Sequence, residues 1–185
     1  ARLFDETQRL LKETEQRAAE LEIINTVQAA LAAELNIQGI YDTVGDKIRE
    51  IFHQGDMGTR IFDPQMGLIH YPYTYENGKR IFIESEPLIE GFSSHVFRTR
   101  ETLVINENML QEVEKYGSTV IPGTQMEKSA VWVPLVVGDQ ARGLICLQNY
   151  DHENAYGESD VRLLQTLTNS MSVPAVLALS IPAAT

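Results

Sequence analysis

The sequence predicts an α+β fold in which an antiparallel sheet of about five to six strands is flanked by helices. Strand-like segments follow one another in runs, and helix-like segments stand at both ends of the chain, which is typical of this class. A third observation is a long N-terminal helix over residues 2–35, a stretch that contains neither proline nor glycine. The 185 residues contain no internal repeat, so one domain with a helical extension is expected.

The first helix carries a seam of heptad spacing, with alternating steps of three and four residues. The apolar seam positions are Leu3, Leu10, Leu21, Ile24, Leu31 and Leu35. Polar residues such as Arg17 and Gln28 interrupt the seam. The spacing favours a marginally stable, parallel coiled-coil dimer, and the alternative is a single amphipathic helix lying on its own domain.

A second helix and a meander of strands are expected next. Asn36 suits an N-cap, apolar residues recur on one face from Ile40 to Phe52, and Gly55 supplies a stop. The expected strands cover residues 57–62, 68–75 and 80–84. Because alternate residues of a strand share a face, Tyr71, Tyr73 and Tyr75 are expected to lie together.

Short helices alternate with strands in the second half of the chain. Helices are expected over 92–99 and 106–116, and strands over 102–105, 129–137 and 142–150. Gly143 allows another backbone to approach its strand closely. A last helix begins near Gly157, and Pro174 is expected to kink or end it.

Composition excludes several classes of function. The net charge of −11 and the lack of a basic run argue against nucleic-acid binding. The single cysteine, Cys146, excludes an internal disulfide. Apolar runs fall short of the roughly 20 residues that cross a bilayer, and the polar N-terminus is not a signal peptide. We therefore expect a cytoplasmic location without membrane insertion.

Three segments, taken in order, resemble the GAF-domain family. The first is Glu90–Asn106, with a glycine before a short helix and then a brief strand; the others are Ser129–Leu147 and Tyr156–Asp160. The resemblance implies a GAF domain over residues 22–175, which overlaps a signalling helix over 1–35 and precedes a tail over 176–185. The opening residues resemble the stretch that follows a preceding GAF domain. They imply a tandem-GAF signalling protein, such as a sensor histidine kinase, in which an adjacent GAF or effector domain is a partner.

The same resemblance implies a ligand pocket between the sheet and the short helices. The candidate pocket residues are Tyr71, Tyr73, Phe92, His95, Trp132, Cys146 and Gln148. The alternatives are that Phe92 and Trp132 are ordinary core residues, that His95 faces solvent, and that Cys146 is a buried, unreactive thiol. None of the four histidines stands at metal-ligand spacing, so no metal and no cofactor is predicted.

The resemblance implies a non-catalytic sensory domain that binds a small ligand or partner and transmits the signal through its terminal helices. One alternative is a ligand-free GAF domain that acts as a structural dimerisation spacer. An open cavity above roughly 300 Å³ would favour sensing, and a collapsed one would favour the spacer. The second alternative is a GAF-type methionine sulfoxide reductase, whose nucleophile and resolving roles need more than one cysteine.

Removal of the first helix tests the predicted dimer. Sedimentation of the full chain is expected to give a dimer, and a chain that lacks residues 1–21 is expected to be monomeric because half of the apolar seam is lost. An unchanged mass in the truncated chain would refute the predicted role of this helix.

Overall fold

The computed structural model describes residues 2–32, 37–53 and 56–179. The helices are α1 (Arg2–Ala32), α2 (Ile37–Phe52), α3 (Phe92–Thr99), α4 (Met109–Tyr116) and α5 (Glu158–Leu179). The strands are β1 (Met57–Asp63), β2 (Leu68–Glu76), β3 (Lys79–Arg80), β4 (Glu86–Pro87), β5 (Leu103–Ile105), β6 (Ser129–Val137) and β7 (Gln140–Asn149). Of the predicted segments, Asn36, Gly55 and residues 180–185 of the tail lie outside the described ranges.

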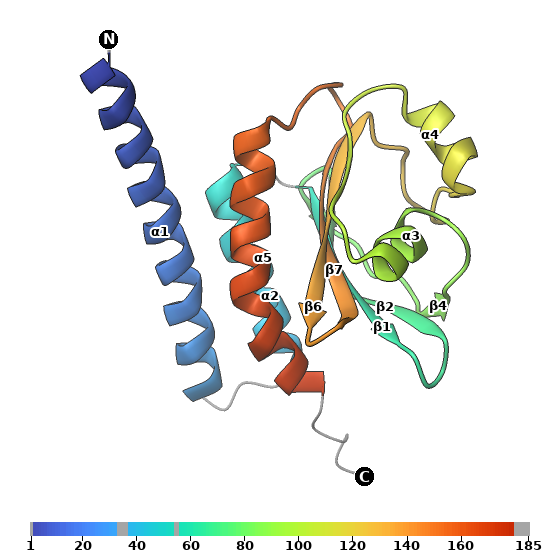
Figure 1. Cartoon of the computed structure of the whole chain (residues 1–185). Helices are drawn as coiled ribbons and strands as arrows, with labels where there is room; N and C mark the ends of the chain where they lie inside the picture. The colour runs from blue at the N-terminus through green and yellow to red at the C-terminus, as the bar shows by residue number, and fades with distance from the viewer. Residues whose placement is uncertain (1, 33–36, 54–55, 180–185) are drawn as a thin grey trace.

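The strands form one sheet in the order β3-β2-β1-β7-β6-β5, and β4 pairs with β2 at one edge. Every pairing is antiparallel. Helices α2 and α5 cover one face, α1 lies outside them, and α3 and α4 lie on the opposite face (Figure 1). The predicted α+β class is confirmed.

The sheet separates two apolar cores. Beneath α2 and α5, the core includes Ile48, Met57, Tyr73, Val133, Ile145, Leu164 and Leu167. Beneath α3, it includes Phe92, Val96, Trp132, Leu144 and Cys146. Alternate residues of β6 and β7 enter opposite cores, as the period of a strand requires.

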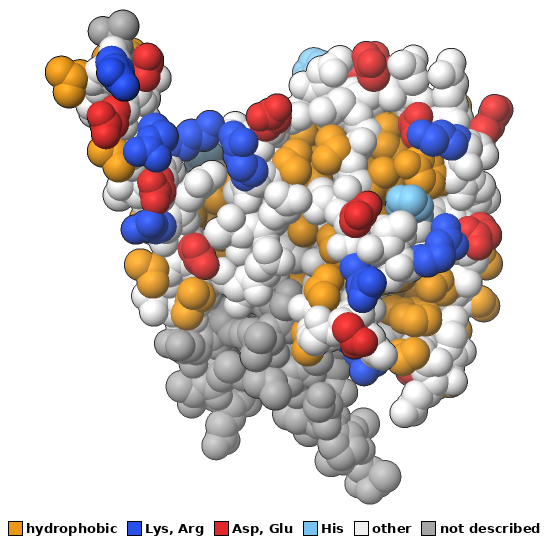
Figure 2. All heavy atoms as spheres, viewed as in Figure 1, with side chains coloured by type: hydrophobic (Ala, Val, Ile, Leu, Met, Phe, Trp, Pro, Cys, Tyr) orange, Lys and Arg blue, Asp and Glu red, His pale blue; other side chains and the backbone are white. Residues whose placement is uncertain are grey.

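The first helix is partly docked on the domain. Ile23 is 1% exposed and enters the core beneath α2 and α5. The seam residues Leu3, Leu10 and Leu21 are instead 82%, 50% and 59% exposed, and Figure 2 shows apolar side chains among charged ones along this helix. Ile24 is half-buried. The side chain of Leu31 and the whole of Leu35 lie outside the described part.

A β-bulge in the β1–β2 pair corrects the predicted placement of the tyrosines. Thr59 pairs with Tyr73 and Ile61 pairs with His70, so Arg60 alone opposes both Tyr71 and Pro72. An extra residue in one strand reverses the alternation of faces beyond it. Tyr73 and Tyr75 therefore pack beneath α2, whereas Tyr71 faces the α3 side.

The predicted strand over 80–84 is also wrong, because β3 ends at Arg80. Pro72 has no N–H to offer a continuing neighbour strand. Its carbonyl oxygen accepts hydrogen bonds from Gln38 Nε2 at 2.7 Å and from Arg80 Nη2 at 2.9 Å. The ladder therefore stops after the bond from the Ile81 N–H to the Thr74 carbonyl.

Two helix boundaries differ from the predictions. Helix α4 begins at Met109 rather than 106, because Asn108 has a positive φ of 56°, which lies outside the helical region. Helix α5 continues through Pro174 to Leu179, so the proline does not end it. A proline inside a helix removes one backbone hydrogen bond at a cost of about 3 kcal/mol. Helix α5 also packs against β6 and α1, which stabilises it.

Gly143 brings β7 against β1, as the sequence predicts. A Cβ atom at this position would lie 2.6 Å from the Arg60 carbonyl oxygen and 2.9 Å from Ile61 Cδ1. The first contact is with backbone, which cannot rotate away. Position 143 of β7 therefore requires glycine, because the backbone of β1 at Arg60 lies too close for a Cβ atom.

Buried Glu76 holds the long segment before β6. Its Oε1 accepts the Gln125 N–H at 3.0 Å, whereas its Oε2 is buried without a partner among the described residues. Burial raises the pKa of Glu76, the Gln125 bond lowers it, and the carboxylates of Asp56 and Glu127 raise it further. The net shift is upward, so the folded chain holds the proton more tightly than the unfolded chain does.

Gly143→Ala is expected to lower the free energy of unfolding by about 2 kcal/mol, the usual effect of overpacking a core. Urea denaturation monitored by circular dichroism measures it. Gly157→Ala is the matched control, because its Cβ would make only an ordinary contact of 3.5 Å with Asp160. Equal stability of the two variants would contradict the required close approach.

Glu76→Gln is expected to stabilise the chain at pH 7 and to lose this advantage as the pH falls. An acid whose pKa is raised by folding destabilises the fold above its unfolded pKa of 4.5. The difference from the parent chain should therefore shrink towards pH 4.5, as measured by urea denaturation at several pH values. The control is Glu101→Gln at an exposed position. A gain that does not depend on pH would contradict this explanation.

Candidate functional site

Two adjoining hollows lie on the α3 side of the sheet, and together they are called the recess. The first has a volume of about 70 Å³ and the second about 40 Å³. Both are lined by Arg60, Phe92, Ser118, Thr119 and Ile121. The start of α3 and the segment over residues 117–127 therefore cover the sheet at Arg60.

Arg60 stands on β1 opposite the bulge in β2, and it lines both hollows. Its Nη1 donates to Ser93 Oγ at 2.6 Å, and its guanidinium carbon lies 5.7 Å from the centre of the Tyr71 ring. No carboxylate of the described residues lies within 4.0 Å of this guanidinium. A guanidinium has five N–H donors and cannot lose its charge, so Arg60 is a cation whose hydrogen-bonding capacity is mostly unused.

Tyr71 closes one side of the first hollow. Its hydroxyl donates to Glu86 Oε1 at 2.6 Å. Burial raises the pKa of Tyr71, the positive charge of Arg60 opposes the rise, and the bond to Glu86 adds to it. The phenol therefore stays protonated, and its hydrogen bond holds one oxygen of the Glu86 carboxylate.

The second hollow is lined by Trp132, Gln148 and Glu127 beside Arg60. The Trp132 side chain is fully buried, and its Nε1–H has no hydrogen-bond partner within the described chain. Buried donors are rarely left unpaired, because the loss of solvation costs about 1–3 kcal/mol. The indole N–H is therefore a buried donor without a partner in the described parts of the protein, on a side chain that lines the second hollow.

Four of the predicted pocket residues line the recess: Tyr71, Phe92, Trp132 and Gln148. The Phe92 ring lies against the Trp132 indole, with ring centres 4.7 Å apart. Both residues also belong to the core beneath α3, so the alternative of an ordinary core role describes them too.

The other three predicted residues lie elsewhere. Tyr73 is on the opposite face, where its hydroxyl donates to Asp46 at 2.6 Å. His95 packs edge-on against Tyr116, with ring centres 4.8 Å apart. Cys146 is fully buried against Gly58, and burial raises the pKa of its thiol, so it matches the alternative of a buried, unreactive cysteine.

Sequence reasoning missed Arg60, Ser93 and Glu127. A signal was present for the first: Arg60 is a lone charge inside the apolar run Met57–Phe62. A charge is rarely placed in a core strand without a partner. Glu127 and Ser93 stand in segments with no periodicity that distinguishes them from solvent-exposed residues.

The recess is small and holds no preformed metal site. Its hollows fall below the roughly 300 Å³ typical of ligand pockets. Over residues 2–32, 37–53 and 56–179, no group of three or more histidine, cysteine or acidic side chains could hold a metal ion. Within these same ranges, no helix is long and apolar enough to cross a membrane.

Comparison with known proteins identifies the fold. The structure is similar to the GAF domain of an Acinetobacter phosphoenolpyruvate-protein phosphotransferase, with a TM-score of 0.74 and 15% identity over 92% of this chain and 98% of that one. A fragment of a methyl-accepting chemotaxis protein has a TM-score of 0.70 and 14% identity, over 89% and 99% of the two chains.

An enzyme shares the fold as well. Free methionine-R-sulfoxide reductase from Neisseria meningitidis, in complex with its substrate, has a TM-score of 0.64 and 14% identity, over 86% of this chain and 90% of that one. No curated protein sequence matches this chain. The family model of the GAF domain matches residues 34–173. The chain therefore belongs to the GAF-domain family of sensory and regulatory modules.

Proposed function

We propose that this GAF domain is a non-catalytic sensor in which a small ligand enters the recess and alters the docking of α1. The observation that carries the proposal is the bulge in β2. It places Tyr71 in the recess and Tyr73, two residues on, against α2. A ligand that moves Tyr71 would therefore strain the contact between β2 and α2.

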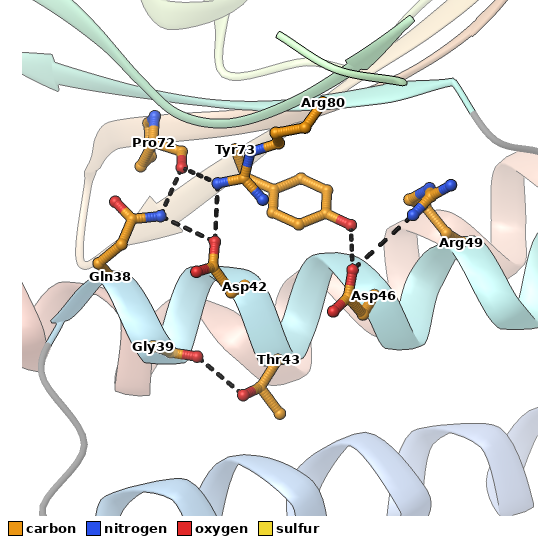
Figure 3. A network of polar contacts seen from close by, with 9 residues as sticks. All are labelled: Gln38, Gly39, Asp42, Thr43, Asp46, Arg49, Pro72, Tyr73 and Arg80. Atoms are coloured by element: carbon orange, nitrogen blue, oxygen red, sulfur yellow. Dashed lines mark hydrogen bonds and ion pairs between the residues drawn. The ribbon is translucent and has the colours of Figure 1, made fainter. Parts of the chain in front are cut away.

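Polar contacts tie this part of the sheet to α2 (Figure 3). The Pro72 carbonyl accepts from Gln38 and from Arg80, and Arg80 Nη2 also bonds Asp42 Oδ1 at 2.7 Å. One helical turn further, Asp46 accepts the hydroxyl of Tyr73. Because these bonds depend on direction, a shift of β2 would change the contacts of the first three turns of α2.

Helix α2 in turn contacts α1. Lys47 Nζ pairs with Glu22 Oε1 at 2.5 Å, and on the neighbouring helix α5 the hydroxyl of Ser170 donates to Glu20 Oε1 at 3.0 Å. Glu22 is 56% exposed, and exposed ion pairs contribute only about 0–1 kcal/mol. Ile23 supplies the buried contact. A ligand whose binding favours one conformation by a few kcal/mol could therefore alter the packing of α1 on α2 and α5.

The exposed residues of α1 support a role for this helix in assembly. We propose that Leu3, Leu10 and Leu21 pair with a second copy of the chain, and that α1 connects this domain to an adjacent GAF or effector domain. A tandem signalling protein, such as a sensor histidine kinase, is the proposed parent. In a homodimer, a change in how α1 packs on its own domain would change how the two parallel α1 helices pack against each other.

The structural spacer is the second candidate function, and the small volume of the recess favours it. Hollows of about 70 and 40 Å³ are closer to a filled cavity than to a ligand pocket. The two functions differ in one respect: a spacer has no reason to couple the recess to α1. A reductase is disfavoured, because Cys146 is buried and no second cysteine is present.

Filling the recess with a side chain tests this coupling without a known ligand. Ile121→Trp enlarges an apolar residue that lines both hollows. Since couplings of 1–3 kcal/mol are ordinary, amide hydrogen exchange in α2 and around Ile23 is expected to change by about tenfold. The change should diminish when Asp42→Asn is added, because that substitution weakens the hold of α2 on Arg80.

The matched control is Leu110→Trp, which adds the same ring to α4 at a position that is 70% exposed. It should leave exchange in α1 and α2 unaltered. If Ile121→Trp alters exchange only within residues 90–128, the recess is not coupled to α1 and the spacer function stands.

A further inference from the structure

The groups that face the recess specify the charge of its ligand. Arg60 and the Trp132 indole can only donate hydrogen bonds. Arg60 lacks a carboxylate partner and Trp132 Nε1 lacks any partner in the described part of the chain. A ligand that satisfies both must bring acceptor atoms and negative charge.

The charged side chains that line the recess favour a ligand with a single negative charge. Among the lining residues, Arg60 is the only cation, and three carboxylates stand around it: Glu86, Glu90 and Glu127. Glu86 is held by Tyr71, and Glu90 lies 3.6 Å from Arg98. A dianion such as a phosphate ester would gain one favourable partner and meet several repulsive ones. A monoanion matches the one guanidinium.

The shape of the group also follows from Arg60. A guanidinium is planar and pairs with a carboxylate through two parallel N–H···O bonds. Its Nη1 is already held by Ser93 at 2.6 Å, which fixes the orientation of the fork. The other lining side chains include the apolar Ile69, Leu88 and Ile121, which suit a short hydrocarbon body.

We infer that the recess binds a compact organic monocarboxylate, whose carboxylate is received by Arg60 and by the Nε1–H of Trp132. The inference rests on the proposed function, because it assigns a ligand class to the same recess. The small volume of the hollows, about 70 and 40 Å³, limits the ligand to a few heavy atoms.

The single tryptophan provides a direct readout. In a proton–nitrogen correlation spectrum of the labelled full chain, Trp132 gives the only indole signal. Titration with acetate, propionate or isobutyrate is expected to move this signal downfield in a saturable way, because its N–H gains an acceptor. The uncharged acetamide, propionamide and isobutyramide, and sodium chloride at equal ionic strength, should leave it in place.

Arg60→Met removes the charge and keeps an unbranched side chain. It is expected to weaken carboxylate binding at least about tenfold, the effect of losing one charge-assisted bond. Arg162→Met, which removes an exposed arginine of α5 on the other face of the sheet, should bind as the parent chain does. If Arg60→Met does not fold, as judged by circular dichroism, Arg60→Lys replaces it. The lysine variant keeps the charge but loses the fork, so it too should bind more weakly.

Several outcomes would overturn the inference. These are an indole signal that no carboxylate moves, equal effects of acids and amides, stronger binding of inorganic phosphate, or undiminished binding by the Arg60 variants. The proposed function is judged separately, because the Ile121→Trp experiment uses no ligand. Carboxylates that bind without altering exchange in α1 would support this inference and refute the sensor.

Discussion

The bulge in the β1–β2 pair is the constraint on which the rest of the structure depends. Because Arg60 stands opposite two residues, the alternation of β2 reverses between Tyr71 and Tyr73. One strand then serves both faces of the sheet: Tyr71 borders the recess, and Tyr73 lies over Gly45 of α2. Without the extra residue in β2, Tyr71 and Tyr73 would lie on the same face. Either the recess or the core beneath α2 would then lack a tyrosine. The close approach at Gly143 holds β1 against β7 at the same level of the sheet.

Arg60 is the one cation among the described residues that line the recess, and its position there calls for a physical explanation. Arg60 loses solvation on the sheet and gains one neutral hydroxyl as a hydrogen-bond partner. Carboxylates line the same hollows, yet the Tyr71 hydroxyl binds Glu86, and Glu127 forms no ion pair with Arg60 within 4.0 Å. Evolution commonly neutralises a buried charge or removes it, because an unpaired one is costly. Within the part of the chain that the structure describes, the unpaired charge of Arg60 and the unpartnered indole N–H of Trp132 line the same recess, and they therefore support the proposed binding site.

The sequence predicts the fold well because its signals are local. Hydrophobic periodicity and turn residues identify α2, α3, β6 and β7 within two residues of their observed limits. The errors arise where distant contacts decide. The strand over 80–84 ends early because side chains from α2 and β3 occupy the Pro72 carbonyl. The site is half predicted: aromatic residues such as Trp132 mark a pocket, whereas the importance of Arg60 depends on a bulge that no local pattern reveals.

The attachment of α1 is compatible with both interpretations of its sequence, a helix that packs on its own domain and a helix that pairs with a second copy. Its second half is fixed by Ile23, which is buried, while polar pairs such as Lys47–Glu22 add little. Its first half exposes Leu3 and Leu10 and makes only local bonds such as the Arg17–Glu13 pair. An isolated helical segment of this kind is marginal in water unless its apolar face is covered. The helix is therefore held at one end by its own domain, while its other end exposes the apolar residues to which we assign the proposed dimer. A change at Ile23 would reach that proposed contact along a continuous helix.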